Sequence, residues 1–443
     1  MSIAGKNFAV IGAGIVGSAL ALWLNSEGAM VSVYERRNAQ AFLKKPKIQK
    51  RNINLALSHR GLKSLNLLKL KDKIMPVCCP MYGRRIYPSV EGPAFFQPYG
   101  LPHQAIYSVS RFDLNLMLHS ALEAANSIKV LYNNTLNAED RGLLVQLENQ
   151  FDGIFWCDGI HSIGRNILEG LGYVTTKVDK ASYGYREVPL NGPLIKNKEA
   201  QALHIWPRDK SMLIALPQAE GHYAGTLFAP FVGSGGLDST TNQEDFQHTI
   251  QSIYLGKDSP FSLTDTPLIN LPASWLKSVN VGPWNYGKHL LLGDAAHAIL
   301  PFYGQGMNAG LEDVYVLSEI ATDNKSPDEI FSAFYARRKI DGDAIKTLAE
   351  RNYWNMKNGT VNKEQLLYKK FEQFLLTRFP NEFKGQYQRV SFGDEPYHKA
   401  LDNGDRVFAK CQVFLRNFSR PEDWVAPEAI TACKSLLTSF HAD

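Results

Sequence analysis

The first 35 residues alternate between short apolar runs and stretches that are rich in glycine or polar residues. Phe8–Ile11 is an uninterrupted apolar run that ends at a glycine, as expected of a buried parallel strand. Ile15–Leu24 carries apolar residues at helical spacing, and Val31–Tyr34 is a second short apolar run. The order strand, glycine turn, helix, strand predicts a βαβ unit.

The next part of the chain mixes helical and strand patterns. Leucines recur every four residues within Ser108–Ala125, which predicts an amphipathic helix. Val130–Leu131 and Leu143–Leu147 are predicted to be strands on either side of a polar turn. Gly153–Trp156 is predicted to be another buried strand.

The pattern changes in the second half of the chain. Between Tyr183 and Phe231, short apolar segments alternate with turn residues, which predicts an antiparallel sheet and a second domain. His289–Leu292 returns as a buried strand, and a helix is expected to begin within Gly304–Leu317. From Ser326 to the end, the pattern is mostly helical.

These elements predict a fold of the class α/β plus α+β. A Rossmann-type domain would comprise residues 1–180 and 281–325, with residues 60–105 or so contributing to a substrate pocket. An interleaved antiparallel-sheet substrate domain would comprise residues 181–280, and a helical C-terminal domain residues 326–443.

Composition and charge narrow the class of protein. The chain has 443 residues, of which 44% are hydrophobic and 21% charged, as in a globular protein. The net charge of +5 is small, and no run of five Lys or Arg occurs, which argues against nucleic-acid binding. The basic stretch from Lys44 to Arg51 is interpreted as a solvated loop.

Cysteine spacing and hydropathy point to a cytoplasmic protein without a membrane anchor. The five cysteines are odd in number and lack zinc-site spacing, so we expect free thiols in a reducing compartment and no bound metal. No secretory signal and no apolar stretch of about 20 residues is present, so no transmembrane helix is predicted. Ala429–Phe440 is expected to be a short amphipathic helix.

The glycine motif Gly12-Ala13-Gly14-Ile15-Val16-Gly17 stands at the turn of the predicted βαβ unit. Gly12 permits a tight turn, Gly14 lets the backbone approach a pyrophosphate, and Gly17 lets helix and strand pack closely. Glu35, at the end of the next strand, can accept hydrogen bonds from ribose hydroxyls and disfavours the 2′-phosphate of NADP. The motif therefore predicts a dinucleotide at a helix N-terminus.

Two later motifs favour FAD over NAD as this dinucleotide. Cys157-Asp158-Gly159 follows a predicted strand, and Gly293-Asp294 closes another. Asp294 can accept a hydrogen bond from a ribityl hydroxyl, and the helix that follows Gly304 can hold the negative charge of reduced flavin. A simple NAD dehydrogenase needs neither motif, and would remain the interpretation only if no flavin were bound.

The three motifs resemble those of the class A FAD monooxygenases of the p-hydroxybenzoate hydroxylase type. Further segments resemble the kynurenine 3-monooxygenase family in particular, over nearly the whole chain. These segments are Arg51–Gly61, Gly83-Arg84, Gln97–Gly100, Ile106–Arg111, Ala202–Pro207, Gly293–Gly310, Asn352-Tyr353 and Pro396-Tyr397.

The resemblance implies roles for individual residues. Arg84 would bind the substrate carboxylate, with Tyr99, Asn352 and Tyr397 completing that pocket. The other implied substrate-binding residues are Ile214, Phe228, Phe302 and Gln305, with Pro301 also near the flavin. The cofactor-binding residues implied by the motifs and the resemblance are Gly12, Gly14, Ile15, Val16, Gly17, Glu35, Arg36, Arg37, Ala56, Arg111, Asp158, Asp294, Gly306, Met307 and Asn308.

The resemblance also implies a reaction. NADPH would reduce FAD, O2 would form a flavin C4a-hydroperoxide, and its distal oxygen would convert L-kynurenine to 3-hydroxy-L-kynurenine. No residue is assigned as a general acid or base, because the aniline amine activates its own ring. His297 is interpreted as a structural neighbour of the flavin.

Three positions depart from the family pattern, and two other functions stay open. Lys50-Arg51-Asn52 replaces Gly-Arg-Ser, Cys157 replaces an alanine, and Tyr303 replaces Phe or His after Pro-Phe. The alternatives are a hydroxylase of a related substituted kynurenine or aryl amine, and a flavin-containing binding or regulatory protein without turnover.

Overall fold

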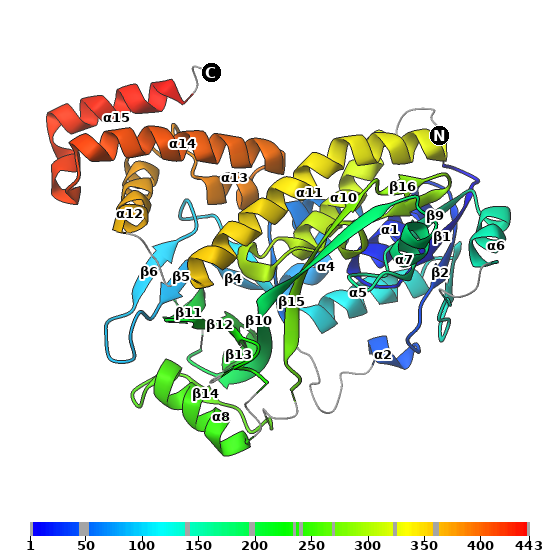
Figure 1. The fold of residues 1–443 in the computed structure, drawn as a ribbon, viewed down its shortest axis with the longest axis horizontal. Coiled ribbons are helices and arrows are strands. Elements are labelled where there is room, and N and C mark those ends of the chain that lie inside the picture. Colours follow the sequence, from blue (N-terminus) through cyan, green and yellow to red (C-terminus); the bar gives the residue numbers. More distant parts are fainter. Residues whose placement is uncertain are drawn as a thin grey trace.

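The predicted βαβ unit lies at the centre of a parallel sheet in a computed structural model of the chain (Figure 1). The structure describes residues 3–43, 53–137, 142–194, 200–233, 236–238, 242–267, 271–321, 326–357 and 363–440. The basic stretch from Lys44 to Arg51, with Asn52 of the family signature, lies outside the described residues.

The first sheet has the strand order β16-β17-β9-β1-β2-β8. Its strands are parallel except for β16, which pairs antiparallel with β17. Helix α1 (Ile15–Ser26) makes the crossover from β1 to β2 and buries one face against the sheet. The strands are β1 (Asn7–Ile11), β2 (Met30–Tyr34), β8 (Ile128–Leu131), β9 (Gly153–Trp156), β16 (Asn285–Tyr286) and β17 (His289–Leu291).

The second sheet is the predicted antiparallel one. Its order is β14-β10-β13-β12-β11-β5-β6, and β15 pairs with the first part of the long strand β10. The single parallel pair along this order joins β5 to β11. The strands are β5 (Gly83–Ile86), β6 (Phe95–Pro98), β10 (Thr175–Asn191), β11 (Ala202–Arg208), β12 (Ser211–Pro217), β13 (His222–Pro230), β14 (Ser262–Leu263) and β15 (Ser274–Gly282).

A small antiparallel sheet, β3-β7-β4, lies beside helix α3 (His59–Leu67). Its strands are β3 (Asn54–Leu57), β4 (Cys79–Met81) and β7 (Ile106–Ser110). The remaining short helices are α2 (Gln40–Leu43), α4 (Lys71–Ile74), α7 (Ile163–Gly170), α8 (Gln243–Thr249) and α9 (Asp294–His297), and a π-helical segment follows α8 at Ile250–Leu255.

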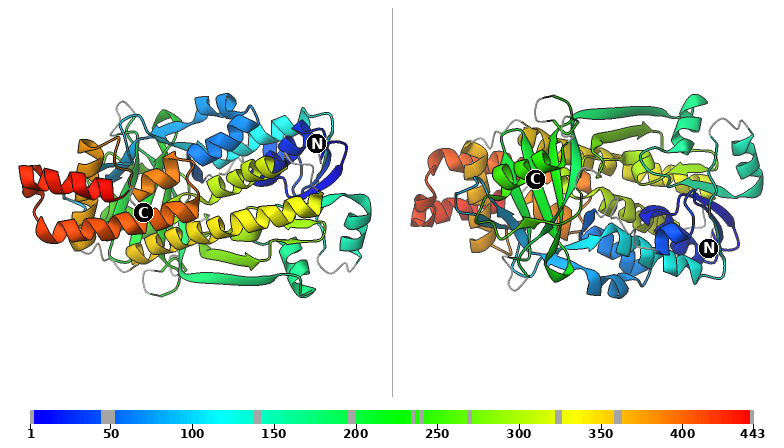
Figure 2. Two further views of the ribbon diagram at one scale, coloured as in Figure 1. Left: turned by 90° about the horizontal axis from the view of Figure 1, so that it is seen from above. Right: turned by 90° about the horizontal axis from the view of Figure 1, so that it is seen from below.

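Helices dominate the described residues from Ser326 onward, as predicted. Helix α11 is the longest and spans much of the molecule, while α12, α14 and α15 lie at the end opposite the first sheet (Figures 1 and 2). None of the described helices is both long and apolar enough to cross a membrane. The helices are α10 (Gly306–Ile320), α11 (Pro327–Lys357), α12 (Lys363–Arg378), α13 (Gln386–Phe392), α14 (Tyr397–Asn417) and α15 (Pro427–Ser439).

The observed elements confirm the predicted fold class, with two corrections of detail. Leu143–Leu147 is wrong as a strand, because it belongs to helix α6 (Leu143–Gln150), which buries Leu143 and Leu147 on one side. The helix predicted over Ser108–Ala125 begins later, as α5 (Arg111–Glu123), because Ser108 belongs to strand β7 and the Ser110 hydroxyl caps the helix.

Candidate active site

The first glycine motif forms an open turn at the N-terminus of α1. Gly12 has a φ of +102°, and a Cβ there would lie 2.7 Å from the carbonyl oxygen of Cys157. A Cβ on Gly17 would lie 1.9 Å from the carbonyl oxygen of Gly12, so helix and turn touch. At Gly14 no atom lies within 4 Å of such a Cβ, and no side chain caps the helix. The turn leaves room and N–H groups for a pyrophosphate.

Glu35, at the end of β2, holds this turn in place. Its Oε2 accepts a hydrogen bond from the Ala13 N–H at 2.9 Å, and its Oε1 accepts one from the Arg37 N–H at 2.8 Å. Burial alone would raise the pKa of Glu35. The positive charge of Arg37, its hydrogen bonds and the hydrogen bond from the Ala13 N–H outweigh burial, so the pKa is lowered. The carboxylate is therefore ionised and oriented at the adenosine end of the expected nucleotide.

Asp158 has an unused buried acceptor. Its Oδ2 accepts hydrogen bonds from the N–H groups of Ile163 at 2.6 Å and Gly164 at 3.3 Å. Its Oδ1 is buried and accepts no hydrogen bond from any described residue. Burial raises the pKa of Asp158. Because an unpaired buried acceptor is costly, this oxygen fits a hydroxyl donor from a bound nucleotide.

Val16 belongs to the glycine motif of residues 12–17 and lies against the motif that begins at Gly293. A Cβ on Gly293 would lie 3.1 Å from Val16, and one on Gly310 would lie 2.6 Å from it, so both glycines allow close packing. Gly293 also has a φ of +58°, which turns the chain from β17 into α9. Asp294, exposed at the start of α9, lies beside this junction. The predicted nucleotide motifs are thus brought together at one edge of the sheet.

Asn308 fixes the loop that leads into α10. Its side-chain amide donates to the carbonyl oxygens of Ala56 at 2.8 Å and Gly304 at 3.0 Å, and its Oδ1 accepts from the Ser58 N–H at 2.9 Å. Gly304 has a φ of +69° and faces Ala56. No side chain caps the N-terminus of α10, where Gly306 and Met307 lie, so its N–H groups suit a negatively charged ring edge.

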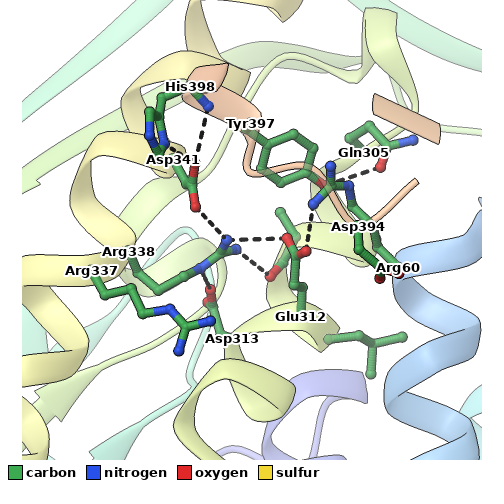
Figure 3. A network of polar contacts seen from close by, with 12 residues as sticks. Arg60, Gln305, Glu312, Asp313, Arg337, Arg338, Asp341, Asp394, Tyr397 and His398 are labelled. Atoms are coloured by element: carbon green, nitrogen blue, oxygen red, sulfur yellow. Dashed lines mark hydrogen bonds and ion pairs between the residues drawn. The ribbon is translucent and has the colours of Figure 1, made fainter. Parts of the chain in front are cut away.

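A buried ionic network lies next to this loop (Figure 3). Arg338 of α11 donates to Asp313 at 3.0 Å and to Glu312 at 3.1 Å, and Arg60 of α3 also pairs with Glu312. His297 lies 2.6 Å from Asp313. Burial acts to raise the pKa of Asp313, but His297 and Arg338 lower it overall. His297 therefore contacts a structural carboxylate beneath the loop.

Arg84 of β5 lies against two tyrosine rings. Its guanidinium carbon is 5.3 Å from the ring centre of Tyr99 and 4.8 Å from that of Tyr387. The Tyr99 and Tyr387 rings stack at 4.9 Å, and Tyr303 lies 5.5 Å from Tyr387. Burial raises the pKa of Tyr99 and of Tyr303, so both phenols stay protonated and can donate. A guanidinium beside phenol donors suits a carboxylate.

Aromatic side chains of the hydrophobic cluster that contains Tyr303 form a wall. The rings of Phe228 and Phe302 are 5.0 Å apart, and Phe302 lies 5.5 Å from Tyr353. Ile214 packs against the same cluster. Asn352 of α11 donates from its side-chain amide to the Phe302 carbonyl oxygen at 3.2 Å. Four of the predicted substrate residues are thus in one region.

Tyr397 lies in a different environment from Arg84. Its ring is 3.9 Å from the guanidinium of Arg60, and its hydroxyl donates to Gln305 Oε1 at 3.1 Å. Gln305 is itself only 1% exposed. The C-terminal tyrosine that contacts Arg84 is Tyr387, which no sequence motif indicates.

Arg36, Arg37 and Arg111 lie at the edges of the nucleotide region and are exposed. Arg111 is the first residue of α5, and its N–H donates to the Ile53 carbonyl oxygen beside β3. Burial is the main cause of the lowered pKa of His161. The positive charges of Lys277, Arg165 and Arg36 lower it further. Several positive groups therefore gather around His161.

Residues 156–322 match the family described as FAD binding domain. The chain is 34% identical to the kynurenine 3-monooxygenase of Flavobacterium psychrophilum, over 98% of the chain and 99% of the relative. It is 34% identical to that of Myxococcus xanthus over 98% of the chain and 97% of the relative. It is 33% identical to that of Dictyostelium discoideum over 90% and 91%.

Solved structures with the same fold include 2-methyl-3-hydroxypyridine-5-carboxylic acid oxygenase, with a TM-score of 0.60, 16% identity, and coverage of 83% of the chain and 96% of that protein. PqsL of Pseudomonas aeruginosa in complex with 2-aminobenzoylacetate gives a TM-score of 0.62 at 15% identity, covering 80% and 97%. From the full-length likeness to curated relatives, the chain belongs to the kynurenine 3-monooxygenase family of FAD-dependent aromatic hydroxylases.

Proposed function

We propose that the chain is an NADPH-consuming monooxygenase that hydroxylates L-kynurenine to 3-hydroxy-L-kynurenine. The observation that carries the proposal is the position of Tyr303, which contacts Tyr387 of the Arg84 pocket and belongs to the same hydrophobic cluster as Phe228 and Phe302. Such a site offers a cation and phenols at one end and apolar rings at the other. An aromatic amino acid has the complementary arrangement.

Residues of the three motifs would hold FAD. The pyrophosphate would lie at the start of α1, and the unused oxygen of Asp158 would accept a hydroxyl hydrogen bond. Bound FAD would supply the redox chemistry, in which NADPH provides two electrons, one oxygen atom of O2 is transferred to the ring and the other is released as water. The cofactor-binding set remains Gly12, Gly14, Ile15, Val16, Gly17, Glu35, Arg36, Arg37, Ala56, Arg111, Asp158, Asp294, Gly306, Met307 and Asn308.

The protein would bind and orient the substrate. Arg84 would bind the carboxylate, and the phenols of Tyr99 and Tyr387 would donate to it. Phe228 and Phe302 would pack against the aromatic ring and exclude water from it. We assign no general acid or base, because the aniline nitrogen of the substrate activates the carbon ortho to itself.

NADPH would approach a positively charged part of the surface. The pKa of His161 is lowered mainly by burial, and further by the nearby positive charges of Lys277, Arg165 and Arg36. The phosphates of NADPH carry the opposite charge and would be attracted there. Glu35 disfavours a 2′-phosphate in the Rossmann turn itself, so we propose that NADPH visits the surface while FAD occupies the turn.

The experiment is a turnover assay with purified protein that contains FAD. NADPH oxidation should rise when L-kynurenine is added, and 3-hydroxykynurenine should appear in the products. A panel with ring-substituted kynurenines and simple aryl amines separates the related hydroxylases. Unchanged NADPH oxidation, without a hydroxylated product, would contradict the proposal and favour a binding or regulatory flavoprotein.

A further inference from the structure

Glu372 of α12 is a buried carboxylate on the same cavity as Arg84. The cavity has a volume of about 40 Å³ and is lined by Arg84, Tyr99, Tyr387 and Glu372 among others. Glu372 is only 8% exposed. A volume of this size holds about two or three water molecules, or a small polar group of similar size.

The carboxylate of Glu372 is only partly paired. Its Oε2 accepts a hydrogen bond from the Lys369 ammonium at 2.7 Å, and the Lys369 side chain is 48% exposed. Its Oε1 is buried and accepts no hydrogen bond from the described part of the chain. Tyr368 lies nearby, and its pKa is raised by burial first, then by the charge of Glu372 and by a hydrogen bond to that carboxylate, so the phenol remains protonated. An unused oxygen on a buried carboxylate calls for a donor.

Gly385 makes room for this oxygen. A Cβ at Gly385 would lie 2.6 Å from Glu372 Oε1, which is too close for the present position of the carboxylate. Gly385 has an ordinary φ of −69°, so its lack of a side chain is not needed for the backbone conformation. The glycine therefore lets a carboxylate lie at the edge of the cavity.

Tyr303 lies under the influence of both charges. Burial is the main cause of its raised pKa, while the negative charge of Glu372 raises the pKa further and the positive charge of Arg84 lowers it. The cavity is thus bounded by the Arg84 guanidinium and by the Glu372 carboxylate, one oxygen of which pairs with Lys369. This pair of charges is complementary to a zwitterion, which carries a carboxylate and an ammonium on one carbon atom.

We propose that Glu372 binds the α-ammonium group of the substrate whose carboxylate Arg84 binds. The inference rests on the proposed function and names the residue that would recognise the amino group of its substrate. A ligand that lacks the amino group would leave Glu372 Oε1 without a donor, and would bind less tightly for that reason. Glu372 would therefore determine the selection of kynurenine over keto acids that carry the same ring.

The test is calorimetric binding of two ligands to the FAD-containing protein. The ligands are L-kynurenine and its analogue without the α-amino group, 4-(2-aminophenyl)-4-oxobutanoate. The unaltered protein should bind L-kynurenine about 10- to 100-fold more tightly than the analogue. Glu372→Gln keeps the shape of the side chain and removes its charge, and should reduce this preference to about threefold or less while leaving the analogue's affinity nearly unchanged.

Two further variants separate binding from structure. Glu364→Gln removes an exposed charge from the same helix and should preserve the preference. Gly385→Ala keeps Glu372 but displaces its carboxylate, and should lower the preference in the same direction as Glu372→Gln. Thermal unfolding of each variant checks that the fold is retained.

Two outcomes would overturn the inference: an unaltered protein that binds both ligands equally, or a Glu372→Gln variant that keeps the full preference. The proposed function fails separately, because it fails when L-kynurenine binds but yields no hydroxylated product. Binding and turnover are measured in different assays, so either claim can be lost while the other stands.

Discussion

The ring of Tyr387 stacks on that of Tyr99, with their centres 4.9 Å apart and their planes 18° apart. Tyr99 follows strand β6, whereas Tyr387 belongs to the short helix α13 in the C-terminal region. The guanidinium of Arg84 contacts both rings. The proposed carboxylate pocket is therefore completed only when the C-terminal helices pack on the second sheet.

Replacing Arg84 tests the pocket directly. Arg84→Met should weaken binding of L-kynurenine by about 100-fold or more, because a buried carboxylate would lose its cation. FAD should remain bound, since the nucleotide motifs are not altered. Arg85→Met is the matched control, because the side chains of Arg84 and Arg85 are consecutive in β5 and point to opposite faces of the sheet. Equal affinity in the two variants would contradict the assignment.

The two C-terminal tyrosines should behave differently. Tyr387→Phe removes a phenol beside Arg84 and should raise the KM for L-kynurenine by about tenfold, with little change in stability. Tyr397→Phe removes the hydrogen bond to Gln305 and should act on the loop that carries Phe302 rather than on the carboxylate. Steady-state kinetics measure both effects. A larger rise in KM from Tyr397→Phe would reverse the assignment.

The ionic network of Figure 3 should dominate the stability of the loop before α10. Arg338→Met would leave Asp313 and Glu312 buried with fewer partners, and should lower the free energy of unfolding by about 3–5 kcal/mol. Arg337→Met removes an exposed pair with Glu319 and should cost no more than about 1 kcal/mol. Urea unfolding compares the two, and similar losses would contradict a structural role for the network.

We expect the buried side chain of His204 to make the stability of the protein depend on pH. It is 2% exposed in the core of the second sheet, and burial lowers its pKa from 6.5 to about 4. Between these values the unfolded chain binds a proton that the folded chain does not, so stability should fall as the pH falls through this range. The loss from this residue at pH 5 should be about 2 kcal/mol. His204→Phe should reduce the slope of unfolding free energy against pH, and an unaltered slope would contradict the prediction.

The elements that the sequence predicts well are those in which apolar and polar residues follow a regular spacing. The βαβ unit and its glycine turn follow from local spacing, and so does the run of antiparallel strands. The prediction of a strand at Leu143–Leu147 is wrong because a short apolar run fits a strand and one side of a helix equally well. Ser110 ends a strand and also caps a helix, a boundary that leucine periodicity does not reveal.

The substrate pocket was harder to predict than the nucleotide turn. Gly12, Gly14 and Gly17 act within one turn, so their spacing alone indicates their purpose. Tyr387 acts through the packing of α13 against a distant strand, which no local pattern specifies. The sequence offers one indication of Tyr387: it is an aromatic residue between polar residues, in the segment that follows Gly385.

The most direct test of the central claim is the fate of molecular oxygen with L-kynurenine as substrate. The FAD-containing protein would be given NADPH and L-kynurenine under 18O2, and the products analysed by mass spectrometry. We predict 3-hydroxykynurenine that carries one labelled oxygen atom, formed in step with substrate-stimulated NADPH oxidation. NADPH oxidation that yields only hydrogen peroxide, with L-kynurenine recovered unchanged, would contradict the account.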